Sequence, residues 1–520
     1  MIQMKKAFFA VALLVSMSAN AHYGRSFFLG ANVGNIAGGG LHEQAGRTHL
    51  FDNDKIYGSF NAHMEYNSSF NASRLGEYLS PIASNTFRVG DANDAAGVTN
   101  NVNVWNAYFL LDEAYTADIS FKPKSSTFTS NLNLFVGLDE WVEGLWLDFN
   151  LPIVHNKRHV KMTETVVTAA ANTVYAANLF LVGAATATVP YTSFVDSMVG
   201  DKTSSNGVLA NNMNFGKING SRSTTKVGNF TAVLGYDVMN KENMHLGVGL
   251  LGLVNGNGKS DAVYMFEPSV GTGGRHGLGG RVNGHVRMYE KDDMEFNLYL
   301  NADVVHLFDA TVKRTYDMTT KHGAWSRYIL FKDWTVAGFG VAPDLNTMVH
   351  GGNFSTLQAK VGMDVMYNVD LVLGYTNGSL GVNVGYGLFG HSKEEHKSWV
   401  DDIASGKKYG ALAIAVADLT AGAVTTSLST NVKIDGGAGN GVIATAAVAA
   451  ATNIISRADF DTNSAMNPSA MVHRVHGDVN YRWEDNEWAP HVGAGAGAEF
   501  GSNNAALRQW GVHAHFGICF

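Results

Sequence analysis

Charged and polar side chains recur on one side of an alternating pattern along several stretches of the sequence. In "LGGRVNGHVRMY", for example, Arg281, His285 and Arg287 share one parity, with apolar or small residues between them. Such a row can hold water and bias which ions pass along it. The candidate lining residues of this kind are Arg281, His285, Arg287, Glu295, Asp303, Lys360, Asp364, Arg474, Asp478, Arg482 and Glu499. Both signs occur, so the pattern predicts mild charge selectivity; the alternative is that these charges pair and fill a narrow interior.

Histidines fall on the same side of the pattern and are candidate metal ligands. They are His63, His285, His476, His491, His513 and His515. No carboxylate or thiolate pattern typical of a metal site accompanies them. We therefore interpret them as ordinary polar lining residues and expect neither a metal nor a cofactor. His306 and His473 lie on the opposite side with no nucleophile beside them, so the sequence does not indicate an enzyme.

Side chains that alternate in this way are positioned by β-strands, because a strand sends successive residues to opposite faces. In the last stretch, "WGVHAHFGICF", every second residue from Trp510 to Phe520 is apolar, and the residues between them are polar or small. The same rhythm predicts twelve strands, near 55–67, 117–138, 144–158, 223–238, 244–255, 275–290, 294–308, 355–376, 379–391, 470–483, 487–500 and 508–520.

The predicted connections alternate between tight turns and long loops. The long ones are 68–116, 159–222, 256–274, 309–354 and 392–469, with 501–507 as a short exception. This asymmetry is typical of a bacterial outer-membrane barrel with short periplasmic turns and long extracellular loops. Because the strands also exceed the usual length of about 5–6 residues, a soluble sandwich is disfavoured. The expected fold is all-β, a closed antiparallel transmembrane barrel of about twelve strands over residues 55–520.

Three runs rich in Ala, Val and Thr interrupt the long loops, at 166–189, 409–429 and 441–456. Apolar runs of this kind cannot stay bare in water. They could pack as an extracellular cap, fold into the mouth of the barrel, or add strands that raise the count to 14 or 16.

The beginning of the chain has the layout of a secretory signal peptide. Lys5 and Lys6 precede an apolar run, and Ala19-Asn20-Ala21 resembles a cleavage site, so residues 1–21 are expected to be removed. Residues 22–54 would then form a periplasmic segment or a plug in the lumen. The remainder carries 35 basic against 45 acidic residues, which disfavours nucleic-acid binding. The 58 glycines, 8 prolines and single cysteine fit an exported all-β chain without a disulfide framework.

The end of the chain resembles the C-terminal assembly signal of Gram-negative outer-membrane proteins, on the residues Phe516, Ile518 and Phe520. This resemblance implies recognition by the outer-membrane assembly machinery and both termini on the periplasmic side. The stretches "SFFLGANVG", "FVGLDEWVEGLWLDFNLPIVH", "GKSDAVYMFEPSVGTG" and "HLFDATVKRTYD" also resemble a porin-like family of uncharacterised barrels from host-associated bacteria. The resemblance implies a location in the outer-membrane lipid bilayer and a barrel fold, but no specific chemistry.

Two functions from different classes follow. The favoured one is a channel for passive diffusion of small hydrophilic solutes, weakly charge-selective and possible as a homo-oligomer. The alternative is a surface protein that adheres or plays a structural role through its long loops, with the barrel as its anchor. Twelve strands lie between the filled eight-stranded and the open sixteen-stranded barrels, so we expect an open diffusion pore, with a plugged or gated lumen as the alternative.

Overall fold

The computed structural model describes residues 57–91, 102–112, 114–170, 191–200, 212–241, 243–256, 258–318, 322–333, 348–411, 428–429, 442–443, 454–483 and 488–520. The predicted signal peptide (1–21) and the segment 22–54 lie outside the described residues. Most of each Ala/Val/Thr-rich run also lies outside them, so the structure does not test whether those runs add strands.

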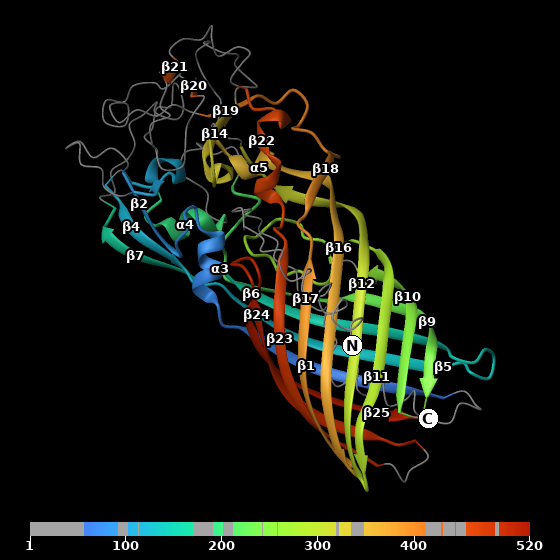
Figure 1. Ribbon diagram of the computed structural model, residues 1–520. Helices are drawn as coiled ribbons and strands as arrows, with labels where there is room; N and C mark the ends of the chain where they lie inside the picture. Colours follow the sequence, from blue (N-terminus) through green and yellow to red (C-terminus); the bar gives the residue numbers. More distant parts are fainter. Residues whose placement is uncertain are drawn as a thin grey trace, which may run out of the picture.

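Twelve long strands form one closed antiparallel barrel with a folded cap at one end (Figure 1). Each barrel strand pairs with the next one along the chain, and the last strand pairs with the first, so the sheet has no free edge. The strands are β1 (Tyr57–Ser69), β5 (Lys124–Gly137), β6 (Leu145–His159), β9 (Asn229–Lys241), β10 (Met244–Asn255), β11 (Gly277–Lys291), β12 (Met294–Thr315), β16 (Thr356–Asn377), β17 (Leu380–His391), β23 (Ala470–Arg482), β24 (His491–Gly501) and β25 (Gln509–Cys519). The predicted fold class and strand count are confirmed.

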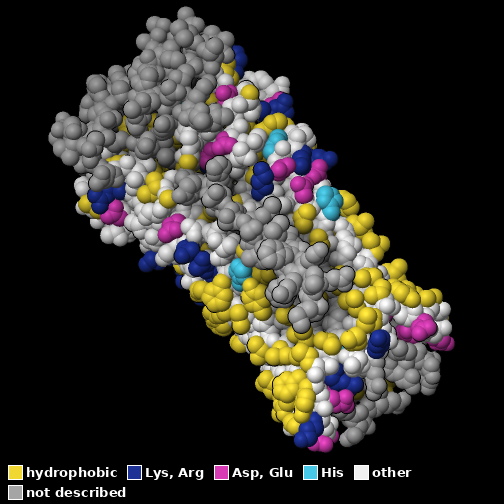
Figure 2. Space-filling model, in the orientation of Figure 1, with side chains coloured by type: hydrophobic (Ala, Val, Ile, Leu, Met, Phe, Trp, Pro, Cys, Tyr) yellow, Lys and Arg dark blue, Asp and Glu magenta, His cyan; other side chains and the backbone are white. Residues whose placement is uncertain are grey.

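The two faces of the barrel differ as the alternation predicts. The outer face is exposed and apolar all the way round, with Phe60, Met64, Leu234, Val248, Leu250, Val282, Val304, Leu371, Val384, Val475, Val492 and Val512 among its side chains. On the face seen in Figure 2, hydrophobic side chains form a yellow band, with charged side chains on both sides of it. The inner face is polar or small. At Gly493 of β24 a side chain would collide with the imidazole of His515, so glycine makes room there for a bulkier neighbour.

Two of the predicted strands are in fact each divided. The predicted strand 117–138 consists of β4 (Thr116–Phe121), which belongs to the cap, and β5, which belongs to the barrel. Pro123 lies between them, and proline interrupts a strand because it has no N–H to donate. The predicted strand 223–238 likewise consists of two strands, β8 (Ser221–Val227) and β9. The cap-end part of β6, from Ile153 to His159, pairs with β8, and the turn-end part of β6, from Leu145 to Asn150, pairs with β9.

The described parts of the long loops fold into the cap, which is built from short elements. A four-stranded sheet contains β2 (Thr86–Gly90), β3 (Val104–Trp105), β4 and β7 (Met162–Thr168), and a three-stranded sheet contains β14 (Leu330–Asp333), β15 (Met348–His350) and β19 (Tyr409–Ala411). The helices are α3 (Ala72–Leu79), α4 (Phe194–Val199) and α5 (Gly351–Ser355), with 3-10 turns η1 (Asn106–Phe109), η3 (Ser326–Tyr328), η4 (Arg457–Asp459) and η5 (Thr462–Ala465). Smaller pairings are made by β13 (Asp317–Met318) with β22 (Phe460–Asp461), β18 (Glu395–Trp399) with β16, and β20 (Leu428–Ser429) with β21 (Val442–Ile443). No helix among the described residues is long and apolar enough to cross a bilayer.

Aromatic side chains from different loops meet in the core of the cap. The ring of Phe87 lies 5.5 Å from that of Trp325, 5.3 Å from that of Phe121 and 6.0 Å from that of Phe194. The indole Nε1 of Trp325 donates a hydrogen bond to the carbonyl oxygen of Leu79, 3.0 Å away. Phe87, Phe194 and Trp325 come from three of the predicted long loops, and Phe121 comes from the cap part of the predicted strand 117–138. These segments therefore share one apolar core and form a single folded cap.

The cap also buries an imidazole, that of His350 at the end of β15, and this predicts a pH dependence. Burial lowers the pKa of His350 to about 4, below the ordinary value of about 6.5, so the folded cap holds the ring neutral. The unfolded chain binds the proton more readily than the folded cap. The contribution of neutral His350 to the stability of the cap is therefore complete above pH 6.5 and is lost as the pH falls towards 4. The loss amounts to about 3 kcal/mol.

We expect the cap to become more sensitive to protease between pH 7.5 and pH 5, and His350→Gln to weaken that dependence. Comparing the variant with the wild type separates His350 from the other groups that titrate in the same range. An identical pH profile for both proteins would show that His350 is not responsible.

Candidate functional site

The inner wall of the barrel brings together nine of the eleven predicted lining residues. They are Arg281, His285, Arg287, Glu295, Asp303, Arg474, Asp478, Arg482 and Glu499. Most of the charged ones pair with one another. Arg281 donates to Asp303 at 2.7 Å and also to Asp148, while Arg474 donates to Glu499 at 2.9 Å. Arg287 faces Glu295 at 3.2 Å.

The other two predicted lining residues, Lys360 and Asp364, were assigned to the wrong face. The pairing of β12 with β16 shifts register beside Leu307, so inner and outer positions exchange along the cap end of β16. Beyond the shift Val361 and Met363 are buried, while the side chain of Lys360 is 52% exposed and pairs with Asp309 at 3.4 Å. These outer charges lie at the cap end of the apolar band.

Histidines line the wall formed by β1, β23, β24 and β25, as the sequence predicts, but their neighbours are carboxylates. The Nε2 atom of His515 lies 2.8 Å from Asp478, and that of His476 lies 3.0 Å from Asp370. The ring of His513 lies 5.2 Å from that of His63. Within the described parts of the chain, no group of three His, Cys, Asp or Glu side chains is arranged to hold a metal ion.

Several inner residues were missed at the sequence level. Asp370 has the same even parity as Asp364 on the same predicted strand, so extending that parity would have found it. His245 shares odd parity with two glycines of β10, and its ring stacks 5.8 Å from that of His285, whose ring in turn lies 5.2 Å from that of Tyr299. These contacts connect neighbouring strands, which the sequence of one strand cannot show.

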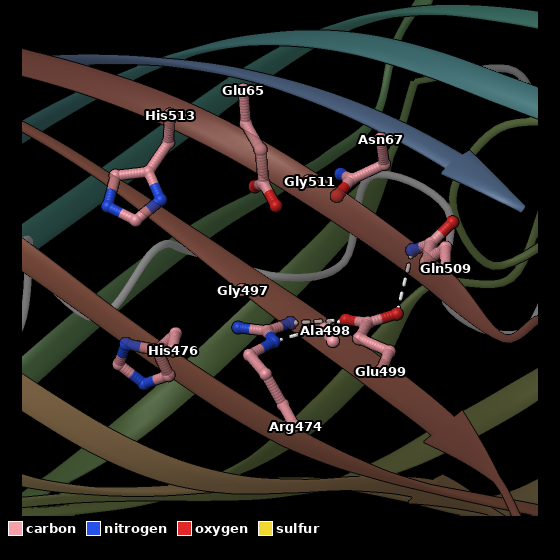
Figure 3. Close-up of a pocket in the computed structure, with 10 residues that line it drawn as sticks. All are labelled: Glu65, Asn67, Arg474, His476, Gly497, Ala498, Glu499, Gln509, Gly511 and His513. Carbon is pink, nitrogen blue, oxygen red and sulfur yellow. Dashed lines mark hydrogen bonds and ion pairs between the residues drawn. The ribbon is translucent and has the colours of Figure 1, made fainter.

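A polar cavity opens in this wall between β1, β23, β24 and β25 (Figure 3). The cavity has a volume of about 20 Å³ and is partly open to solvent. In the view of Figure 3, Glu65 and His513 approach it from one side, and Arg474 and His476 from the other. The full lining is Glu65, Asn67, Arg474, His476, Gly497, Ala498, Glu499, Gln509, Gly511 and His513.

Apolar side chains replace this polar lining at the cap end of the barrel. Leu253, Leu307, Met363, Phe389 and Val472 are all buried there and belong to one apolar cluster. Leu253, Phe389 and Val472 lie near the ends of their strands that lead into the cap, and Leu307 and Met363 lie beside the register shift between β12 and β16. The interior therefore has a polar lining in its middle section and buried apolar side chains beneath the cap.

The predicted assembly-signal residues lie along the seam where the barrel closes. Phe516, Ile518 and Phe520 follow one another at every second position, and Phe516 and Phe520 are exposed on the outside. The N–H of Gly58 donates to the carbonyl oxygen of Phe520 at 2.6 Å, and the N–H of Phe520 donates to that of Gly58 at 2.9 Å. The last residues of the chain thus pair with the first strand. On the inside, Arg482 donates to the sulfur of Cys519 at 2.8 Å.

The chain matches none of the protein families and none of the curated proteins with which it was compared. Solved structures that it resembles include an outer membrane channel from Pseudomonas putida F1, at 11% identity over 89% of this chain and 96% of that chain, with a TM-score of 0.34. Another is the transport unit of the autotransporter AIDA-I from Escherichia coli, at 8% identity over 92% and 96% of the two chains, TM-score 0.30. A third is the Pseudomonas putida toluene transporter TodX, at 8% identity over 94% and 95%, TM-score 0.29. These scores are low, so the functional conclusions rest on the geometry of the chain itself.

Proposed function

We propose that the protein is an outer-membrane channel through which small hydrophilic solutes diffuse passively. The observation that carries the proposal is the contrast between the two faces of the barrel. Its outer face is an exposed apolar band, whereas its inner wall is polar and contains a cavity. A bilayer requires every backbone group to pair within the protein, which a closed barrel achieves. Water and dissolved solutes require the polar interior.

The borders of the apolar band support a position across the membrane. At the cap end, Lys360, Asp309 and Lys397 mark the change to charged side chains. At the turn end, Tyr481 and Trp483 pack against each other, as do Trp488 and Phe520, and such aromatic girdles lie at membrane interfaces. In this orientation the cap faces outward and the tight turns face the periplasm.

Export and assembly complete the proposal. Residues 1–21 would direct export and be removed, and Phe516, Ile518 and Phe520 would present the closing strand to the outer-membrane assembly machinery. Association into homo-oligomers is compatible with this role. Because Leu253, Phe389 and other apolar side chains are buried in the interior beneath the cap, the route suits small solutes and requires these side chains to move.

A pair of tryptophan substitutions on adjacent residues tests the route. Asn67 lines the cavity, while Tyr66 points outward from the same strand. Asn67→Trp should fill the cavity and reduce the unit conductance in a planar bilayer severalfold, whereas Tyr66→Trp should leave it unchanged because aromatic residues already suit that face. A wild-type protein that never conducts, or variants that conduct alike, would contradict a route through this cavity.

The folded cap favours a second candidate, a surface protein that binds through the cap while the barrel anchors it. The N–H of Ile455 donates to the carbonyl oxygen of Tyr409 at 2.8 Å, so a short glycine linker could join these positions in place of residues 411–453. The channel proposal expects such a variant to keep its conductance. The second candidate would be favoured by a wild type that binds cells without conducting, together with a loss of that binding in the variant.

A further inference from the structure

One carboxylate in the cavity, that of Glu65, makes no hydrogen bond or ion pair with any described residue. Glu65 lies opposite His513 in the pairing of β1 with β25, and its side chain reaches into the cavity (Figure 3). The other inner carboxylates each have a partner. These are Asp148 and Asp303 with Arg281, Asp237 with Trp146, Glu295 with Arg287, Asp370 with His476, Asp478 with His515, and Glu499 with Arg474.

A second unsatisfied group faces the same space. The side chain of His513 is buried, with 9% of its surface exposed, and its Nε2 atom has no hydrogen-bond partner. A buried polar atom without a partner costs about 1–3 kcal/mol, so such an atom needs an explanation. Glu65 and His513 are cross-strand neighbours, and both line the cavity. A ligand that donates hydrogen bonds to both would remove the cost.

The charge of the inner wall favours a cation as that ligand. Eight carboxylates lie on the inner wall, namely Glu65, Asp148, Asp237, Glu295, Asp303, Asp370, Asp478 and Glu499. Below the cap end, four arginines lie there, namely Arg281, Arg287, Arg474 and Arg482, whereas the cationic side chains of Arg158, Arg222, Lys226 and Arg314 stand at the cap end. Negative walls around a low-dielectric cleft concentrate cations. The guanidinium of Arg474, the nearest positive group, is already held by Glu499.

We propose that the cavity is a binding site for small organic cations that carry a primary ammonium group. This proposal rests on the channel function and specifies the class of solute that the channel favours. An ammonium group has several N–H donors, which the Glu65 carboxylate, the Nε2 atom of His513 and the amide oxygen of Asn67 can accept. A metal ion fits less well, because the described residues contain no group of three His, Cys, Asp or Glu side chains that could ligate one.

Competition with a potassium current through the purified, full-length protein in a planar bilayer tests the site. Methylammonium and tetramethylammonium carry the same charge, but only methylammonium has N–H donors. Methylammonium should inhibit the potassium current at a concentration about tenfold lower than tetramethylammonium, the ratio expected for hydrogen bonds to a charged group. Glu65→Gln should raise the inhibitory concentration of methylammonium about tenfold, because the charge is lost from a low-dielectric cleft.

A matched control is Glu395→Gln, which removes the same charge from an exposed position that is paired with Lys397 outside the barrel. It should leave the inhibition unchanged. Protease resistance of the barrel strands equal to that of the wild type will show that the Glu65→Gln variant has folded. If the wild type conducts but does not distinguish the two cations, or if Glu65→Gln behaves like Glu395→Gln, the ammonium site is wrong and the channel function stands. If the wild type does not conduct at all, both proposals fail.

Discussion

Replacing Glu394 by glutamine is expected to release the cap from the barrel. Glu394 follows β17 and is buried between two arginines. Arg275 donates to it at 2.8 Å and Arg314 at 3.0 Å, and the N–H of Asn467 donates to its second oxygen at 2.9 Å. Arg314 belongs to β12, while Arg275 precedes β11 and Asn467 belongs to the cap. One carboxylate therefore ties barrel strands to the cap.

The size of the effect follows from burial. Burial alone would raise the pKa of Glu394, but the charges of Arg314 and Arg275 hold that pKa below its ordinary value, so the group is ionised in the folded protein. Glutamine keeps the shape and removes the charge, which leaves two buried guanidinium groups uncompensated. Breaking a buried ion pair from one side costs about 3–5 kcal/mol. The same stabilisation is present above the ordinary carboxylate pKa and is lost as the pH falls below it.

Limited proteolysis of the refolded protein measures this effect, because the cap should be cut while the barrel strands resist. Glu395→Gln is the control, since it changes the adjacent residue, whose side chain is 42% exposed. An exposed pair contributes about 0–1 kcal/mol, so the control should resemble the wild type. Equal protection of the cap in both variants would show that the buried triad does not hold it.

The barrel was predictable because its signal is local. Alternation of apolar and polar residues along one strand needs no knowledge of neighbouring strands, and it identified all twelve. Two local exceptions limited it. Pro123 divides one predicted strand, and this proline was visible in the sequence. The register shift beside Leu307 was not visible, because a bulge depends on how β12 meets β16, and it sent Lys360 and Asp364 to the outer face.

For the candidate site, the sequence predicted which side chains face inward but not which of them are in contact. Parity shows that Arg281 and Asp148 face inward, but their contact joins β11 to β6, which lie far apart in sequence. The same holds for the cap, where Phe87, Phe194 and Trp325 meet from separate loops that have no strand periodicity. Glu65 could not be distinguished from paired carboxylates until the partners of the others were known.

The substitution Leu250→Arg should destabilise the barrel strongly if the outer face of the barrel lies in lipid. Leu250 is in the middle of β10, points outward and is 59% exposed, with Leu234 opposite it on β9. A bilayer places this position near its midplane, where an arginine on the lipid face of a barrel costs about 2–4 kcal/mol. If the same face were exposed to water, the substitution would not destabilise the protein, because an exposed arginine is well solvated. Urea titration of the protein in lipid vesicles measures the difference in the free energy of unfolding.

In a bilayer, unlike other apolar surroundings, the cost of an arginine depends on its distance from the midplane. Phe308→Arg provides the comparison at a position away from the midplane. Phe308 is also exposed and outward, at 48%, but it adjoins Asp309 at the cap-end border of the apolar band. There the cost of arginine falls to about 0–1 kcal/mol, because the side chain reaches the interface. A contact with another protein copy has no reason to follow that gradient along the barrel axis. If both substitutions lowered the free energy of unfolding by the same small amount, the apolar band would be in contact with water. The proposal of a membrane channel would then be wrong.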